Sequence, residues 1–258
     1  MNATVSLNLF QTGVLLFAFI GAVRLVGVDR RTTRVVFFAF AMACALLSNL
    51  YWLAYDILRP ETRMPFAANE IGEWALFLLM GASLGADPVP GALHIEAVCA
   101  ALFSAASAAL WIAWSGEWVQ DILTGAAYGY FICRLLVRIR REGVFSGWEW
   151  VVLAAVCPVL IAAQAAIFFV PLALKRPLDL FCYALLFAVA ALMIARAVPA
   201  LKNGAPAEAA VLRAYAAYAW TLTALYMSAG GFYTAALMLG TLCILLMFLA
   251  LRREAAAA

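Results

Sequence analysis

The chain has 258 residues, of which 68% are hydrophobic and only 12% are charged, whereas an ordinary soluble domain is about half apolar and about a quarter charged. This composition excludes a water-soluble globular protein. The net charge of +3, from 17 basic and 14 acidic residues, is too small and too dispersed for a nucleic-acid-binding surface. We therefore expect residues 1–258 to form a single integral membrane domain, with no soluble domain, no nucleic-acid partner and the lipid bilayer around it.

Long apolar runs divide the chain into segments that match the length of a membrane-spanning helix. A bilayer core about 30 Å thick needs about 20 apolar residues in an α-helix. Turn residues such as Asp87-Pro88 and Gly230-Gly231 separate most of the runs. The runs cover residues 5–28, 35–58, 66–86, 92–114, 117–136, 150–170, 178–198, 207–228 and 232–251. The sequence thus predicts an all-α, polytopic transmembrane helix bundle of about nine spans, built as one helix followed by four tandem hairpins.

The basic residues predict how this bundle is oriented, because cytoplasmic loops collect Lys and Arg. With the N-terminus outside, all but four of the 17 basic residues fall at the cytoplasmic ends of the predicted spans. The four exceptions are Arg59, Arg63, Lys175 and Arg176. We therefore expect the C-terminus to be cytoplasmic, in a multi-pass protein of a plasma membrane of the bacterial inner-membrane type. Span 66–86 has Glu70 and Glu73 in its first two turns; if it were re-entrant, every later orientation would invert and the charge asymmetry would be lost.

The cysteines and the single histidine give no sign of a bound metal or cofactor. The six cysteines lie in six different apolar runs and form no C-x-x-C pair, so neither a disulfide framework nor a metal site is indicated. No nucleotide-binding, dinucleotide-binding or calcium-binding motif occurs. We expect the protein to need no metal and no cofactor.

One pattern occurs twice in the sequence. Residues 72–85 and 116–129 both read G-E-W-x6-G-A-x-x-G, and each copy is predicted to open a span that runs from outside to inside. In lipid, small residues four positions apart let helices pack closely. The pairs Gly81 with Gly85 and Gly125 with Gly129 therefore predict helix-packing faces. The same Gly-x-x-x-Gly faces also suit contact with a second copy of the chain or with a partner subunit.

Acidic and aromatic residues gather near the predicted outer ends of the spans. Ionisable groups at membrane depth are costly and commonly functional, and carboxylates combined with aromatic faces are suited to hold an organic cation. The predicted substrate-binding residues are Asn49, Trp52, Asp56, Glu73, Trp74, Glu117, Trp118 and Asp121. An aromatic belt at the interface and acids that complement helix N-termini explain many of the same residues without a ligand.

The predicted sixth span contains two residues that are unusual in an apolar helix, Pro158 and Gln164. Proline removes a helical hydrogen bond and frees a carbonyl group. Such polar groups either line a cavity or are satisfied by a neighbouring side chain.

Three functions follow from these patterns. The sequence favours a non-enzymatic protein that binds and transports a small amphipathic or cationic solute through a site near the outer face. Residues 81–85 also match G-x-S-x-G, and Ser83, His94 and Asp87 supply the residue types of a serine hydrolase acting on a lipid, although this motif normally stands at a strand-to-helix turn and here the sequence predicts a helix. A membrane sensor or accessory subunit, which binds a partner through the glycine faces, is the third interpretation.

Overall fold

The computed structural model describes residues 3–27, 33–58, 68–85, 95–202 and 205–257. Within these residues the chain forms nine α-helices and no strands, in agreement with the nine apolar runs. The helices are α1 (Ala3–Gly27), α2 (Thr33–Leu58), α3 (Ala68–Ser83), α4 (Ile95–Ser115), α5 (Trp118–Arg141), α6 (Gly147–Ala166), α7 (Leu172–Lys202), α8 (Ala207–Tyr226) and α9 (Gly230–Ala257).

Seven of these helices are long and apolar enough to cross a bilayer, namely α1, α2, α4, α5, α6, α7 and α9. The protein is therefore a multi-pass integral membrane protein. The other two differ for separate reasons. Helix α3 has only 16 residues, or about 24 Å at 1.5 Å per residue. Helix α8 carries Glu208, Arg213 and three tyrosines, which lower its hydropathy.

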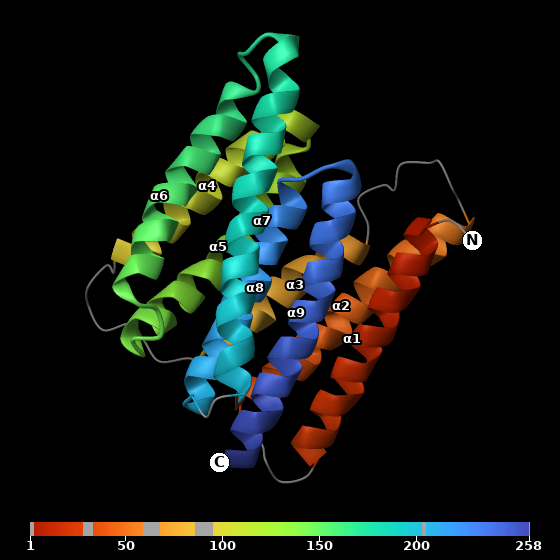
Figure 1. Ribbon diagram of the computed structural model, residues 1–258. Coiled ribbons are helices and arrows are strands. Elements are labelled where there is room, and N and C mark those ends of the chain that lie inside the picture. The colour runs from red at the N-terminus through yellow and green to blue at the C-terminus, as the bar shows by residue number, and fades with distance from the viewer. Residues whose placement is uncertain (1–2, 28–32, 59–67, 86–94, 203–204, 258) are drawn as a thin grey trace.

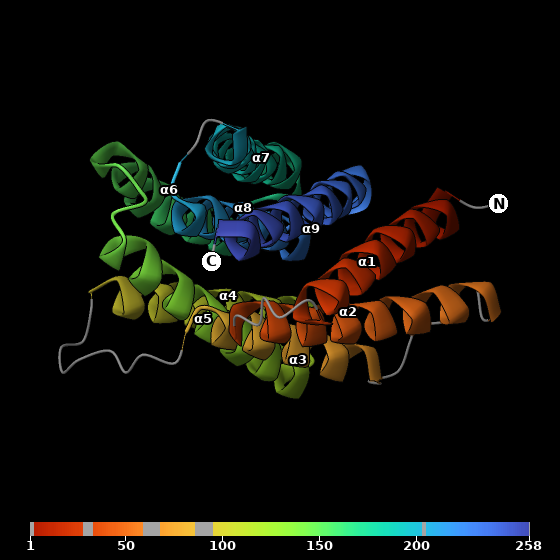
Figure 2. The same cartoon turned by 90° about the horizontal axis from the view of Figure 1, so that it is seen from below.

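Helix α8 lies at the centre of the bundle, which explains how it tolerates polar residues. Its side chains are buried almost without interruption from Ala210 to Ala224, because α5, α7 and α9 pack around it. Seen from below, the helices form two layers, with α6, α7, α8 and α9 in one and α2, α3, α4 and α5 in the other (Figure 2). Helix α1 packs against α2 and α9 at one side of the bundle.

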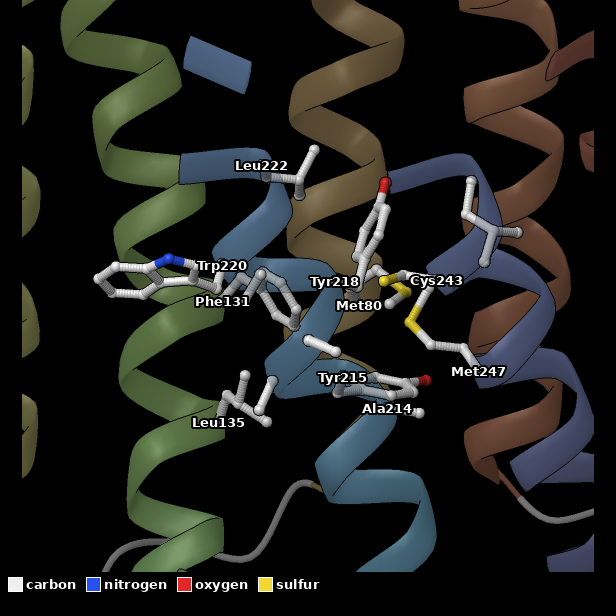
Figure 3. Packing of buried hydrophobic residues seen from close by; sticks show 14 of the residues in the cluster. Met80, Phe131, Leu135, Ala214, Tyr215, Tyr218, Trp220, Leu222, Cys243 and Met247 are labelled. Atoms are coloured by element: carbon white, nitrogen blue, oxygen red, sulfur yellow. The ribbon is translucent and has the colours of Figure 1, made fainter. Parts of the chain in front are cut away.

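Two large polar side chains around α8 are paired across helices. The indole N–H of Trp220 donates to the carbonyl of Leu186 at 2.9 Å, and the Tyr128 hydroxyl donates to the carbonyl of Ala219 at 2.6 Å. Figure 3 shows Trp220 pointing to one side of α8, while Tyr215 and Tyr218 point to the other, toward α9. The centre of the protein is thus a packed aromatic core with satisfied hydrogen bonds.

Several helix boundaries differ from those predicted. Lys175, Arg176 and Pro177 were expected to lie between the predicted spans 150–170 and 178–198, but they lie inside α7, which begins at Leu172. A proline near a helix start removes only one intrahelical hydrogen bond. Helix α6 begins three residues earlier than predicted, where the Glu149 carboxylate accepts hydrogen bonds from the backbone N–H and the hydroxyl of Ser146, both at 2.7 Å. This is a capping box, which extends the helix start.

The two ends of the bundle carry different chemistry. The end where α2, α4, α6 and α8 begin is called the basic end (Figure 1). The opposite end, where α3, α5 and α7 begin and carry acids such as Glu70, Asp121 and Asp179 near their starts, is called the acidic end. At the basic end Arg34 pairs with Glu208 and Glu254, both at 2.5 Å, and Arg138 pairs with Glu208 at 3.0 Å. Arg213 pairs there with Glu149 at 2.8 Å, and the side chain of Glu149 is only 1% exposed. The arginines expected to orient the protein thus also hold its helices together.

Candidate functional site

Among the predicted substrate-binding acids whose side chains the structure describes, Glu73 is the one that meets aromatic rings inside the bundle. The Tyr226 hydroxyl of α8 donates a hydrogen bond to its carboxylate at 3.1 Å. The Tyr226 ring in turn lies 5.4 Å from Trp111, 6.2 Å from Phe77 and 6.2 Å from Tyr128, measured between ring centroids. A carboxylate therefore stands beside a cluster of four rings contributed by α3, α4, α5 and α8.

The predicted tryptophans do not share this cluster. The indole N–H of Trp74 donates to the Thr124 hydroxyl at 2.9 Å and so joins α3 to α5. Trp52 is 38% exposed on α2 and Trp118 is 62% exposed at the start of α5. Both exposed rings have the position of an aromatic belt, in which amphipathic side chains lie at the membrane interface.

Asn49 connects two helices instead of facing the acids. Its side-chain amide donates to the carbonyl of Asn8 at 3.1 Å and to the hydroxyl of Thr12 at 2.7 Å, so it ties α2 to α1. Asp56 lies on the last two turns of α2, and its side chain falls outside the described residues.

Glu117 is the residue that precedes α5, and Asp121 lies in the first turn of that helix. Gly116 has φ +77°, a left-handed conformation that glycine adopts without strain. The hydroxyl of Ser115 accepts from the Glu117 backbone N–H at 2.9 Å and donates to the Asp121 carboxylate at 2.5 Å. The described residues thus place the predicted acids at separate positions, with Glu73 in the interior and Glu117 and Asp121 at a helix start.

The Ser83 hydroxyl is engaged in local hydrogen bonds. It donates to the carbonyl of Met80 at 2.6 Å and lies 3.0 Å from the hydroxyl of Tyr215. The proposed partners His94 and Asp87 lie outside the described residues. The hydrolase arrangement therefore rests on the sequence pattern alone.

The glycines of the repeated pattern pack helices against each other within the chain. A methyl group at Gly125 would lie 2.7 Å from the Cβ of Ala108, and one at Gly129 would lie 2.9 Å from the Cβ of Ser104. In the first copy, a methyl group at Gly81 would overlap the ring of Tyr130 on α5. The predicted packing face of the second copy is thus occupied by α4 of the same chain. In the first copy only Gly81 packs in this way, because Gly85 lies beyond the end of α3 with φ +102° and has no atom within 4 Å of an added methyl group.

A pocket of about 620 Å³ lies between the two layers, bounded mainly by α4, α5, α6 and α8. Its deep wall includes Tyr128 and Thr223, whose hydroxyls lie 2.6 Å apart. Its lining is largely apolar, with Glu96 and Arg140 at the basic end, where the two side chains pair at 3.3 Å. Pro158 of α6 also lines the pocket. Of the two alternatives that the sequence left open for this proline, the structure therefore supports a position beside a cavity.

The larger pocket opens on the side of the bundle. Three of its lining residues on α4, Ile95, Cys99 and Leu102, are exposed, as are Ala154 and Pro158 of α6 across from them. Ile95 is 71% and Leu102 66% exposed. These exposed lining residues lie on two helices that are long and apolar enough to cross a membrane, so the pocket is open between α4 and α6 at the side of the bundle.

A second pocket of about 130 Å³ lies nearer the acidic end, bounded by the last turns of α4, α6 and α8 and the first turns of α7. Its polar lining residues include Gln164, Asp179 and Ser228. Asp179 and Ser228 were not among the predicted site residues, because only the assembled helices bring them together. The presence of Gln164 in an apolar span was a sequence signal that pointed here.

The two pockets follow each other along the same helices. On α4 the larger pocket ends at Ala106 and the smaller begins at Leu110; on α6 the corresponding residues are Ile161 and Gln164. This separation is about one helical turn, or about 5 Å. From Ile95 to the end of the smaller pocket, α4 covers about 28 Å, close to the thickness of a bilayer core.

Comparison with known proteins found no counterpart for this chain: no family model matches it, and neither a curated protein nor a solved structure does.

Proposed function

We propose that this membrane protein binds a small amphipathic molecule in the larger pocket and moves it between the two ends of the bundle. The observation that carries the proposal is the apolar pocket of about 620 Å³ with a charged pair at its basic end. Ligand pockets usually measure roughly 300–1,000 Å³ and combine apolar walls with a few polar groups. A pocket of this kind fits an apolar chain with a polar group at one end.

The lateral mouth determines where such a molecule comes from. Because the mouth between α4 and α6 lies among exposed apolar side chains, an amphipathic molecule dissolved in the bilayer can enter it directly. The bilayer is itself apolar, so transfer of a chain into the pocket gains little from the hydrophobic effect. Preference for one molecule must therefore come from the shape of the pocket and from the polar residues Glu96 and Arg140.

The second pocket supports movement as well as binding. Both pockets lie along α4, α6 and α8, about one helical turn apart. The rings of Tyr128, Tyr226 and Trp111 connect them, since Tyr128 lines the larger pocket while Tyr226 and Trp111 line the smaller one. These contacting rings are the barrier that a moving solute would have to pass, and the Glu73 carboxylate lies directly behind them.

Binding is tested with a fatty acid that carries a photoreactive diazirine in its chain, added to proteoliposomes that contain the full-length protein. We expect covalent labelling on the peptides of α4, α6 and α8 that line the larger pocket. The variant Ala106→Phe places a ring in the pocket and should remove most of this labelling. The matched control is Ala105→Phe on the same helix, because Ala105 is exposed and does not line the pocket. Labelling that is confined to lipid-facing residues such as Phe17 and Phe40, or that Ala106→Phe leaves unchanged, would contradict the proposal.

Movement is tested separately with a phospholipid whose headgroup carries a fluorophore that dithionite destroys. In vesicles with the protein, we expect probe from the inner leaflet to reach the outer leaflet faster than in protein-free vesicles. Ala106→Phe should slow this exchange and Ala105→Phe should not. An exchange rate independent of the protein would refute movement of this probe while leaving the binding result intact.

A further inference from the structure

The smaller pocket has the chemistry of a binding site in its own right. It is bounded by four helix ends, those of α4, α6, α7 and α8, and has a volume of about 130 Å³. A water molecule occupies about 30 Å³ in the liquid. The pocket therefore has room for about four waters or for an organic molecule of similar size.

Two polar groups of its lining residues are buried without a partner. The indole N–H of Trp111 and the hydroxyl of Ser228 make no hydrogen bond with any described residue, and both residues line the smaller pocket. Leaving a buried polar group unpaired is costly, and nearly all such groups in folded proteins have a partner. Two unpaired groups on residues around one small cavity are therefore the polar partners that a molecule bound there would engage.

The charge of the lining indicates which kind of molecule this is. Asp179 is the one acidic residue among the lining residues, which include no Lys or Arg. Within the described part of the chain, Asp179 makes no ion pair. Aromatic rings form much of the remaining wall, and their faces attract cations. The ring-bearing residues are Trp111, Trp114, Phe168, Tyr183 and Tyr226.

We propose that the smaller pocket binds a small organic ammonium ion that also carries a hydrogen-bonding oxygen, such as a hydroxyalkylammonium group. The ammonium group would donate to Asp179 and lie against the aromatic faces. The oxygen would accept from the Trp111 indole and share a hydrogen bond with Ser228. Such a group occurs both in free small molecules and in lipid headgroups. This site does not depend on a ligand in the larger pocket.

The proposal is tested by titrating ethanolamine hydrochloride into the full-length protein in nanodiscs of phosphatidylglycerol, with sodium chloride at equal ionic strength as the blank. We expect saturable binding in isothermal titration calorimetry. Asp179→Asn should weaken it by about tenfold or more, the size of one lost charge-assisted hydrogen bond. The control Glu142→Gln, an acid at the opposite end of the bundle, should stay within about twofold. Absence of saturable binding, or equal affinity in Asp179→Asn, would overturn the proposal.

A second pair of ligands tests the oxygen contact. Ethylamine lacks the hydroxyl group of ethanolamine, so the wild-type protein should bind it more weakly. Trp111→Phe keeps an aromatic ring but removes the N–H donor, and it should abolish most of this preference. A preference that persists unchanged in both Trp111→Phe and Ser228→Ala would refute the assigned contacts.

Nanodiscs that contain phosphatidylethanolamine distinguish the two sources of the group. A lipid headgroup that occupies the pocket would weaken the apparent affinity for free ethanolamine in these discs, whereas an unchanged affinity assigns the pocket to a free solute. Both results support the site. Ala106→Phe, which fills the larger pocket, should leave ethanolamine binding unchanged, so failure of the function proposed above and failure of this site are separately visible.

Discussion

Replacing Arg34 by alanine should destabilise the protein more than replacing Arg138, although both arginines lie in the same ion-pair cluster. The Arg34 guanidinium donates to Glu208 at 2.5 and 3.0 Å and to Glu254 at 2.5 Å, and its Nε donates to the carbonyl of Ser83 at 3.2 Å. A single side chain thus joins α2 to α3, α8 and α9 at the basic end.

The size of the effect follows from what the substitution leaves behind. The Arg34 side chain is only 11% exposed, and those of Glu208 and Glu254 are 25% and 19% exposed. Removing one partner of a buried ion pair costs about 3–5 kcal/mol, because the remaining charge is left uncompensated. We expect a loss of about 3 kcal/mol in the free energy of unfolding, at the lower end because water reaches the two carboxylates.

Arg138→Ala should cost less for a specific reason. Arg138 donates to Glu208 at 3.0 Å, but Glu208 would keep its contacts with Arg34. Arg138 also pairs with Glu142 at 3.5 Å, an i,i+4 pair that contributes little because it is partly exposed. The loss should therefore be about 1.5–2 kcal/mol, the lower part of the range for one hydrogen bond to a charged group. Arg140, which is 62% exposed in its pair with Glu96, serves as a control whose replacement should change stability by less than about 1 kcal/mol.

The measurement is equilibrium unfolding of each variant in mixed micelles with increasing sodium dodecyl sulfate, followed by far-ultraviolet circular dichroism. Adding Glu254→Gln to Arg34→Ala should restore part of the lost stability, since it removes one of the uncompensated charges. Equal losses in Arg34→Ala and Arg138→Ala, or no recovery in the double variant, would refute this account of the cluster.

Three further substitutions test individual contacts with the same unfolding assay. Gly129→Ala brings a methyl group to 2.9 Å from a serine of α4 and should cost about 1–3 kcal/mol through overpacking, whereas Gly13→Ala, with no atom within 4 Å of the new methyl, should be neutral or stabilise by up to about 1 kcal/mol. Tyr226→Phe removes the donor to Glu73 and should cost about 1.5–3 kcal/mol; an unchanged stability would argue against that hydrogen bond. Asn49→Ala removes both amide contacts to α1 and should cost about 1–2 kcal/mol. It should not change ethanolamine binding; a loss of binding would show that Asn49 belongs to the ligand site.

The number of helices could be predicted because membrane length and apolar composition act locally along the chain. Each apolar run of about 20 residues became one helix. This includes α3, which is shorter than the seven candidate spans, and α8, whose hydropathy is lower than theirs. Helix ends were harder to predict. The start of α6 depends on Ser146 and Glu149, a capping pattern visible in the sequence, but the continuation of α7 through Pro177 has no comparable local signal.

The repeated pattern shows why site residues were harder to predict than helices. Gly72 and Gly116 occupy equivalent positions in the two copies, yet Gly72 lies inside α3 against α2, with the carbonyl of Cys44 3.1 Å from an added methyl group, whereas Gly116 forms a left-handed turn. The neighbouring acids differ accordingly: Glu73 accepts a hydrogen bond from Tyr226 in the interior, and Glu117 stands at a helix start. The same residue types acquire different roles because different helices pack against them.

The distribution of unpaired polar groups separates a ligand site from ordinary packing in this bundle. Polar side chains on α8 such as Trp220 and Thr223 find partners on other helices or on their own backbone, which is what a helix buried among other helices requires. Among the described residues, the buried side-chain atoms without a partner belong to Asn69, Ser104, Trp111, Ser228 and Glu254. Two of these line the same small pocket, together with an acid that makes no ion pair with any described residue. Packing alone is expected to leave few such groups and to leave them apart from one another, whereas a binding site brings them together. The smaller pocket is therefore the part of the structure whose polar groups are explained better by a ligand than by folding.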